Sequence, residues 1–178
     1  GGFVLKESMI PLIDPIISGG TGSISHSEEI PDFMPDRFEP GTMNIPGIVG
    51  LHQGLLWLRS HGIENTLSHE LSLTKRFLDG LQPLVDSGDI AVFGMPDTEG
   101  RVGVVSIQTL KVDPATTAFN LDFEYGIQTR VGLHCAPHAH KTLGSYPTGT
   151  VRFSFGNFNT TDEVDAAIEA LKAICKEA

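Results

Sequence analysis

The sequence predicts an α/β protein whose second part is a small α+β domain. From residue 63 onward the pattern reads helix, strand, strand, helix, strand, strand, helix, which packs helices against a small, largely antiparallel sheet. Residues 1–62 supply a strand-like run, a long irregular stretch and one helix, too little to stand alone. We therefore predict two parts: residues 1–62, which finish a larger domain, and residues 63–178, a complete small domain.

Composition excludes several classes of partner. The 178 residues carry 12 Lys+Arg against 22 Asp+Glu, a formal charge of −10, and form no basic cluster, so we expect no nucleic acid and no anionic membrane as partner. Apolar runs stay well short of the roughly 18 residues that a membrane span needs. Two cysteines are too few for a disulfide framework, so we expect a reducing, cytoplasmic setting.

The first 45 residues are the least regular. Gly1–Leu5 is an apolar, strand-like run that begins at once, without an initiator Met or a signal peptide, and predicts that the natural protein continues on the N-terminal side. Residues 6–45 hold many glycines and prolines and no sustained period. Their interspersed Ile, Phe and Met predict an ordered, packed loop.

Two helices are predicted next. The first is amphipathic, has Asn44 as a candidate cap and Pro46 in its first turn, and ends near Gly62. The second follows at once and ends before Ser87. Their apolar residues recur at helical spacing: Ile48, Leu51, Leu55 and Leu58 in the first, and Leu67, Leu71, Leu78 and Leu81 in the second.

The remaining elements follow from alternation and capping signals. Strands are predicted at Ile90–Phe93 and Val102–Leu110, the second with Val105 and Ile107 on one side. Asp113-Pro114 opens a helix that Gly126 closes. Short strands at Ile127–Val131 and Thr150–Phe155 precede a last helix, which Thr160 and Glu163 announce as a capping box.

The densest reactive cluster spans Arg130 to His140, on a predicted loop between two strands. Cys135 beside His134 and near Arg130 could act as a nucleophilic thiolate. The same thiol with His134, His138 and His140 could instead bind zinc, although the usual Cys-x-x-Cys spacing is missing and we assign no metal ligand. A surface thiol without function is the third interpretation. Cys175 falls in line with the apolar residues of the last helix and is predicted to lie in the core.

Two further residues have both a functional and a structural interpretation. Arg152 alternates with apolar residues in a strand, so it needs an anion, either a protein carboxylate or the carboxylate of a substrate. Thr42 lies just ahead of a predicted helix start, where a hydroxyl and free N–H groups suit a phosphate, unless Thr42 or Asn44 simply caps the helix. The glycine-rich run at 19–23 lacks the lysine of a phosphate loop and is a weak candidate.

Four motifs together match a known family. In this order, and over essentially all 178 residues, the sequence resembles the C-terminal part of a cysteine desulfurase of the class V aminotransferase type. The motifs are Gly-Gly-Thr-Gly-Ser at 19–23, Pro-Asp-Arg-Phe-Glu-Pro-Gly-Thr-Met-Asn-Ile-Pro-Gly at 35–47, Arg-Val-Gly-Leu-His-Cys-Ala-Pro at 130–137, and Gly-Thr-Val-Arg-Phe-Ser-Phe-Gly-Asn-Phe-Asn-Thr at 149–160.

The resemblance implies a homodimeric enzyme of the pyridoxal-phosphate-dependent transferase fold type I. Such enzymes convert L-cysteine to L-alanine and leave the sulfur as a persulfide on a protein cysteine. Cys135 matches that cysteine, Arg152 matches the arginine that holds the substrate carboxylate, and Arg130 matches a further arginine near the substrate. Within Gly41-Thr42, the threonine matches the residue that reaches the cofactor phosphate of the other subunit.

The resemblance also places the Schiff-base lysine of pyridoxal phosphate outside this chain, before the strand that corresponds to Gly1–Leu5. None of the six lysines stands in the required context, so the chain alone is expected to be inactive. Alternatives are a selenocysteine lyase or another class V aminotransferase or lyase, and a metal-binding or sulfur-carrying module built on Cys135 and its histidines. A sulfur-acceptor protein is an expected partner of the desulfurase.

Overall fold

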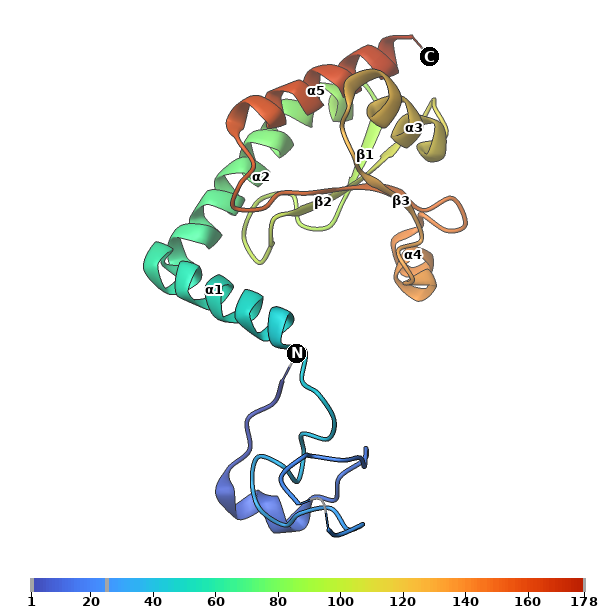
Figure 1. Cartoon of the computed structure of the whole chain (residues 1–178). Helices are drawn as coiled ribbons and strands as arrows, with labels where there is room; N and C mark the ends of the chain where they lie inside the picture. Colours follow the sequence, from blue (N-terminus) through green and yellow to red (C-terminus); the bar gives the residue numbers. More distant parts are fainter. Residues whose placement is uncertain (1, 25, 178) are drawn as a thin grey trace. The chain divides into compact units, whose positions relative to one another are not determined.

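The computed structural model describes residues 2–24 and 26–177, and it divides the chain into two compact units, Gly1–Ser60 and His61–Ala178. The element order is η1 (Glu7–Leu12), α1 (Ile45–His61), α2 (Ile63–Asp86), β1 (Ile90–Phe93), β2 (Val104–Thr109), α3 (Pro114–Tyr125), β3 (Arg130–Gly132), α4 (Pro137–Leu143), β4 (Thr150–Ser154) and α5 (Thr161–Lys176) (Figure 1).

The first unit consists of a 3-10 helix, an irregular stretch and helix α1. The strand predicted at Gly1–Leu5 is wrong for residues 2–5, which are extended without pairing to another strand of the described chain, while Gly1 lies outside the described residues. Backbone groups form a strand only where a neighbour pairs with them. Phe3 instead packs edge to face on Phe38, with ring centroids 5.9 Å apart.

The irregular stretch is held by polar contacts more than by apolar burial. The Arg37 guanidinium donates to Asp32 Oδ1 at 3.0 Å and to the carbonyl of Ile13 at 3.3 Å. Among residues 2–24 and 26–60, only Pro31 is buried, and Ile16 is fully exposed. The expectation of a packed loop is therefore wrong within this unit. The predicted helix is present as α1, but residues 45–56 are all exposed, so its apolar residues are not buried within the described chain.

The second unit is a four-stranded antiparallel sheet with strand order β1-β2-β4-β3. Helices α2 and α5 pack on each other, α3 packs on α5, and α2 and α3 contact the sheet (Figure 1). Their apolar side chains and one side of the sheet form the core. Its fully or nearly buried members include Leu73, Phe77, Leu81, Val105, Ile107, Leu121, Val151, Phe153, Val164 and Leu171.

Strand alternation sorts the side chains of the sheet onto two faces. On β2, Val105, Ile107 and Thr109 are buried, as their predicted alternation requires. On β4, Val151 and Phe153 are buried and point to the same core. The residues between them therefore point to the opposite face, where Arg152 of β4 lies.

Capping explains where the last two long helices begin. The carboxylate of Asp113 accepts the backbone N–H of Ala115 at 2.9 Å at the start of α3. At the start of α5 the Thr160 hydroxyl accepts the Glu163 N–H, and the Glu163 carboxylate accepts the Thr160 N–H at 2.8 Å. Both predicted caps are confirmed, and each satisfies N–H groups that a helix start leaves without partners.

Two predicted strand starts are wrong, and one helix was not predicted. Strand β2 begins at Val104 and β3 begins at Arg130, not at Val102 and Ile127. The second error has a clear cause: the N–H of Ile127 donates to the carbonyl of Leu121 and that of Gly126 to Asp122, so residue 127 still belongs to the C-terminal cap of α3. The predicted loop after β3 also contains helix α4, which has Pro137 in its first turn.

Candidate active site

Strands β3 and β4 bring two arginines together on the face of the sheet opposite the core. Arg130 is the direct cross-strand partner of Arg152, and Arg152 is also the partner of Ser106 on β2. These three residues thus form a row across β3, β4 and β2. Like charges placed directly opposite each other repel, so this face carries a locally positive field despite the net charge of the chain.

Arg152 has an incomplete set of partners. Its Nε is buried and finds no hydrogen-bond acceptor within the described part of the chain. A buried guanidinium nitrogen without a partner costs free energy, and the usual solution is an anion. The ion pairs found among the described residues do not include Arg152.

Cys135 lies on a tight turn directly after β3. The residue before it and Cys135 itself adopt left-handed backbone angles, with φ of 51° at His134 and 59° at Cys135. Two successive non-glycine residues in this region are unusual, and such backbone is found most often at functional sites. The turn exposes Cys135, and the Arg130 Nη2 donates to its Sγ at 3.8 Å, so a positive charge lies beside the sulfur.

The histidines of the cluster separate into different environments. The Nε2 of His134 lies 3.0 Å from the carbonyl oxygen of Arg130. His140, on α4, is buried, and its Nδ1 lies 2.7 Å from the hydroxyl of buried Ser145. The rings of His134 and His140 contact each other, with centroids 5.6 Å apart. His138 is exposed on α4.

This arrangement does not support the zinc interpretation. Across residues 2–24 and 26–177, no group of three or more His, Cys, Asp or Glu side chains is arranged to hold a metal ion. His140 is engaged with Ser145 instead. Cys175 is buried among the apolar residues of α5, as predicted, and burial raises the pKa of its thiol.

In the first unit, two of the predicted motifs meet. The N–H of Gly41 donates to the carbonyl of Gly20 at 2.7 Å, which joins the glycine-rich run to the Gly41-Thr42 motif. Asn44 is the cap of α1, because its Oδ1 accepts the N–H of Gly47 at 3.1 Å. Thr42 precedes this cap, is exposed, and remains a candidate for phosphate binding.

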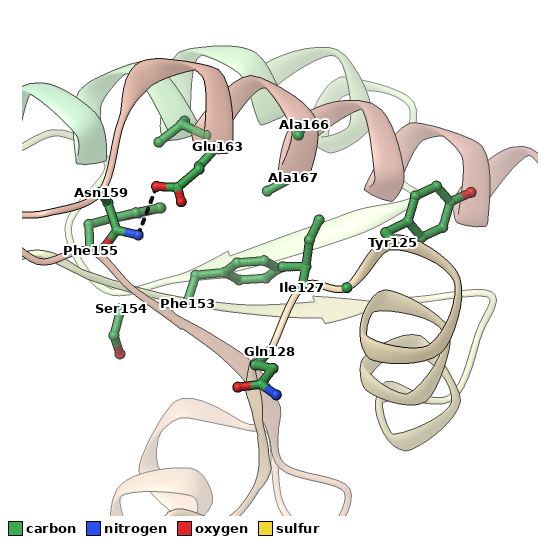
Figure 2. A pocket seen from close by; sticks show the side chains of 12 residues that line it. Tyr125, Ile127, Gln128, Phe153, Ser154, Phe155, Asn159, Glu163, Ala166 and Ala167 are labelled. Carbon is green, nitrogen blue, oxygen red and sulfur yellow. Dashed lines mark hydrogen bonds between the residues drawn. The ribbon is translucent and has the colours of Figure 1, made fainter.

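A pocket of about 340 Å³ in the second unit lies elsewhere. It opens between the end of β4, the segment after α3 and the first turn of α5, and Figure 2 shows Phe153, Ile127 and Tyr125 around it. The hydrogen bond from Asn159 to the Glu163 carboxylate closes one side (Figure 2). Its lining includes neither Cys135 nor either arginine of the row. The space exists because residues 127–129 do not continue β3 along β4.

Four of the six lysines of the chain are engaged in other contacts. Lys75, Lys111 and Lys172 form ion pairs with Asp79, Asp89 and Glu169 at 2.7–2.8 Å, and the Lys141 ammonium lies 5.0 Å from the centre of the Tyr146 ring. The donors of this chain therefore fit the anionic groups of a substrate or cofactor, through arginines and N–H groups.

The second unit is thus an α+β domain whose sheet pairs Arg130 with Arg152 and which carries an exposed cysteine on the turn after β3. Residues 2–167 match the family Aminotransferase class-V, and the chain belongs to this family. The family is one of pyridoxal-phosphate-dependent enzymes. None of the described helices is long and apolar enough to cross a membrane.

The similar proteins found by sequence are probable cysteine desulfurases. The chain is 33% identical to a probable cysteine desulfurase of Pyrococcus abyssi, over 98% of this chain and 42% of that protein. It is 36% identical to a probable cysteine desulfurase of Aeropyrum pernix, over 95% of this chain and 42% of that protein. The chain thus spans about two fifths of the length of these relatives.

Solved structures agree with the fold. An apo structure of a cysteine desulfurase from Thermococcus onnurineus superposes with a TM-score of 0.80 at 29% identity, over 98% of this chain and 42% of that one. The cysteine desulfurase CsdA of Escherichia coli superposes with a TM-score of 0.74 at 26% identity, over 96% of this chain and 41% of that one. The predicted family and the fold type I of pyridoxal-phosphate-dependent transferases are confirmed.

The sequence also left residues of this region unrecognised. Ser145 was not singled out, and His140 was considered only as a metal ligand, whereas both are buried and hydrogen-bonded to each other. A signal for helix α4 was present, since Pro137 stands at its start and Gly144 follows its end. That helix would have placed His140 near its last turn, away from the exposed His138.

Proposed function

We propose that this chain is the thiol-bearing part of a pyridoxal-phosphate-dependent cysteine desulfurase, in which Cys135 accepts sulfur from L-cysteine. The observation that carries the proposal is the placement of the Cys135 sulfur beside Arg130, which is itself directly opposite Arg152 on one face of the sheet. A substrate held by its carboxylate at this row would present its side chain near the accepting thiol. Membership of the class-V aminotransferases supplies the reaction class.

In this function Arg152 binds the carboxylate of the substrate, which gives its buried Nε the acceptor that it needs. The thiolate of Cys135 attacks the substrate sulfur, forms an S–S bond and breaks the bond between that sulfur and the β-carbon. The electron pair of the broken bond stays on carbon, which takes up a proton and becomes the methyl group of alanine. The sum is L-cysteine plus Cys135 thiol giving L-alanine plus Cys135 persulfide, without an external oxidant.

Pyridoxal phosphate, when bound, supplies the electron sink that this chemistry requires. We assign Gly41 and Thr42 to its phosphate, in the cofactor site of the second subunit of a homodimer. The lysine that binds the cofactor comes, in this proposal, from a segment outside these 178 residues. An acceptor protein with a thiol then removes the sulfur, and a reducing, cytoplasmic setting suits both steps.

The decisive experiment is Cys135→Ala in the complete polypeptide that carries this chain. We expect the cysteine-dependent persulfide to disappear while the absorbance of the bound cofactor stays unchanged, because the thiol accepts sulfur but does not hold the cofactor. Cys175→Ala is the matched control and should keep the persulfide. Normal sulfide release from cysteine by the Cys135→Ala enzyme would overturn the proposal and favour another aminotransferase or lyase.

A second test uses the chain alone. Mixed with pyridoxal phosphate and reduced with borohydride, the 178-residue chain should gain no stoichiometric cofactor adduct, since four of its six lysines lie in other contacts. Mass spectrometry of the reduced protein measures this. One cofactor per chain, mapped to a single lysine, would contradict the placement of that lysine outside the chain.

A further inference from the structure

The turn that carries Cys135 is connected to buried residues by hydrogen bonds and one contact between two rings. Ser145 is 2% exposed and His140 is 7% exposed, and their hydroxyl and Nδ1 lie 2.7 Å apart. The His140 ring contacts the ring of His134, which precedes Cys135. The backbone N–H groups of Ser145 and Tyr146 also donate to the His140 carbonyl, at 3.0 and 3.2 Å. The set therefore runs from the interior to the turn.

His134 is fixed at two points. Its Nε2 lies 3.0 Å from the carbonyl oxygen of Arg130, and a carbonyl only accepts, so Nε2 carries a proton and donates it there. This bond connects the ring to Arg130, the first residue of β3, and the ring contact with His140 connects it to α4. A ring held in this way restricts the backbone of His134, and with it the direction in which Cys135 leaves the turn.

Such support is needed because the backbone conformation is unfavourable on its own. A left-handed conformation costs about 1 kcal/mol or more per non-glycine residue, and His134 and Cys135 adopt it in succession. Without its supports the turn would relax to other conformations. The contact that such relaxation would lose is the one between Arg130 Nη2 and Cys135 Sγ, because Cys135 is exposed and that interaction is long, at 3.8 Å.

We propose that His134, His140 and Ser145 are positioning residues, which hold the left-handed turn so that the Cys135 sulfur stays beside Arg130. The inference rests on the proposed function for the purpose of this geometry, namely that the sulfur acceptor must meet an anionic substrate bound at the arginine row. It assigns a role to the buried His140–Ser145 pair, which the proposed reaction itself does not use. None of the three residues exchanges atoms with the substrate.

The test measures the surroundings of the sulfur without requiring turnover. Site-resolved mass spectrometry gives the alkylation rates of Cys135 in the 178-residue chain with iodoacetate, an anion, and with iodoacetamide, a neutral analogue. The iodoacetate rate is divided by the iodoacetamide rate, and this ratio is divided by the same ratio for free cysteine. A cation beside the sulfur raises the result, because it attracts the anionic reagent. Arg130→Met gives the ratio without that cation. Cys175 does not interfere, because it is buried and resolved as a separate peptide.

Ser145→Ala and His134→Ala should each lower the rate ratio about threefold, toward the Arg130→Met value, the size expected for losing one exposed charge contact. His138→Ala and Thr142→Ala are matched controls on α4, whose side chains are exposed, and should keep the wild-type ratio. His134 is partly exposed, so His134→Ala keeps the test valid if the buried Ser145→Ala variant fails to fold.

Two results would overturn the inference: wild-type ratios in folded His134→Ala protein, or a wild-type chain whose ratio already equals that of Arg130→Met. Either result leaves the proposed function standing if persulfide formation still depends on Cys135 in the complete enzyme. Conversely, the ratio could drop threefold in the Ser145→Ala and His134→Ala chains while the complete enzyme still works without Cys135. That result would support the role of the three positioning residues and contradict the proposed desulfurase function. The two failures are therefore separate.

Discussion

The placement of the two arginines of the sheet costs folding free energy, and the proposed anion site explains why the chain keeps it. Arg130 and Arg152 are direct cross-strand partners, an arrangement of like charges that weakens a sheet. The buried Nε of Arg152 adds a second cost. In the proposed function a substrate carboxylate bound at this pair would offset both costs.

Arg152→Met should therefore separate stability from function. In the 178-residue chain we expect the free energy of unfolding to rise by about 1 kcal/mol, because the substitution removes the cross-strand repulsion and a buried polar atom while it keeps an unbranched side chain. In the complete enzyme the same change should abolish cysteine turnover. Urea unfolding followed by circular dichroism measures the first effect, and a less stable Arg152→Met chain would contradict the argument.

Arg152→Lys tests the geometry of the proposed carboxylate contact. Lysine keeps the charge but not the planar fork that binds a carboxylate through two parallel bonds, so KM for cysteine should rise roughly tenfold or more. Arg76→Lys, at the exposed ion pair with Asp165, is the control and should leave KM unchanged. Equal KM values for Arg152→Lys and the unmodified enzyme would remove Arg152 from the carboxylate site.

At the scale of single residues, sequence reasoning could name Cys135, Arg130 and Arg152 as candidates because motif spacing and strand alternation are local properties. It could not identify the partnership of His140 with Ser145. That contact depends on burial by tertiary structure, and the sequence separation of five residues offers no period that would reveal it. It also could not show that Arg130 and Arg152 are opposite each other, since register depends on where β3 begins.

Among the elements, helix α5 begins at a carboxylate whose pKa is lowered in the folded protein. The Thr160 backbone N–H, and next the Asn159 side chain, donate to the Glu163 carboxylate and lower its pKa. A lowered pKa in the folded state means that this cap stabilises the protein fully above the ordinary pKa of glutamate. Its contribution is lost as the pH falls through the lower, folded-state pKa.

Glu163→Gln should accordingly weaken the acid dependence of stability. Glutamine still accepts the Thr160 N–H and so keeps the capping box, but it does not titrate. The drop in Tm between pH 7 and pH 3 should be smaller in this variant than in the unmodified chain. Glu169→Gln, at an exposed ion pair on the same helix, serves as the comparison. If both variants changed the acid dependence equally, the cap would not be its source.

The connection between α4 and β4 depends on one close backbone approach. Gly149 has φ of 79°, and a Cβ added there would overlap the backbone of Gly132 on β3. Gly149→Ala should therefore destabilise the chain by about 2–3 kcal/mol, since it combines left-handed strain with a steric clash. Gly144 has φ of 80° but open space around it, so Gly144→Ala should lower the unfolding free energy by only about 1 kcal/mol. Similar losses of unfolding free energy at the two sites would contradict the assigned clash.

Element prediction from the sequence succeeded where caps and alternation are local. The helices at 63–86, 114–125 and 161–176 and the strand at 90–93 lie where the patterns placed them. Boundaries failed where a neighbour decides, as at Ile127, which the cap of α3 retains. Helix α4 was missed because its seven residues are too few for an apolar period.

At the scale of the whole chain, apolar burial is distributed very unequally. The core residues all belong to His61–Ala178, whereas Val4 and Ile16 of the first unit are fully exposed and α1 exposes Ile45, Val49 and Leu55. Large exposed apolar surfaces mark contacts with further protein. The proposed function predicts that this surface of the first unit packs against the rest of the large domain and the second subunit.

The unequal core predicts that residues 61–178 fold alone. This segment holds the whole sheet, helices α2, α3 and α5 and the described apolar core, so its thermal unfolding should be cooperative, with a Tm within a few degrees of that of the 178-residue chain. A peptide of residues 1–60 should show no cooperative transition, because Pro31 is its only buried residue among 2–24 and 26–60. Calorimetry of the three chains measures both. A Tm of the 61–178 segment far below that of the full chain would contradict this prediction. It would show that residues before 61 contribute to the stability of the second unit.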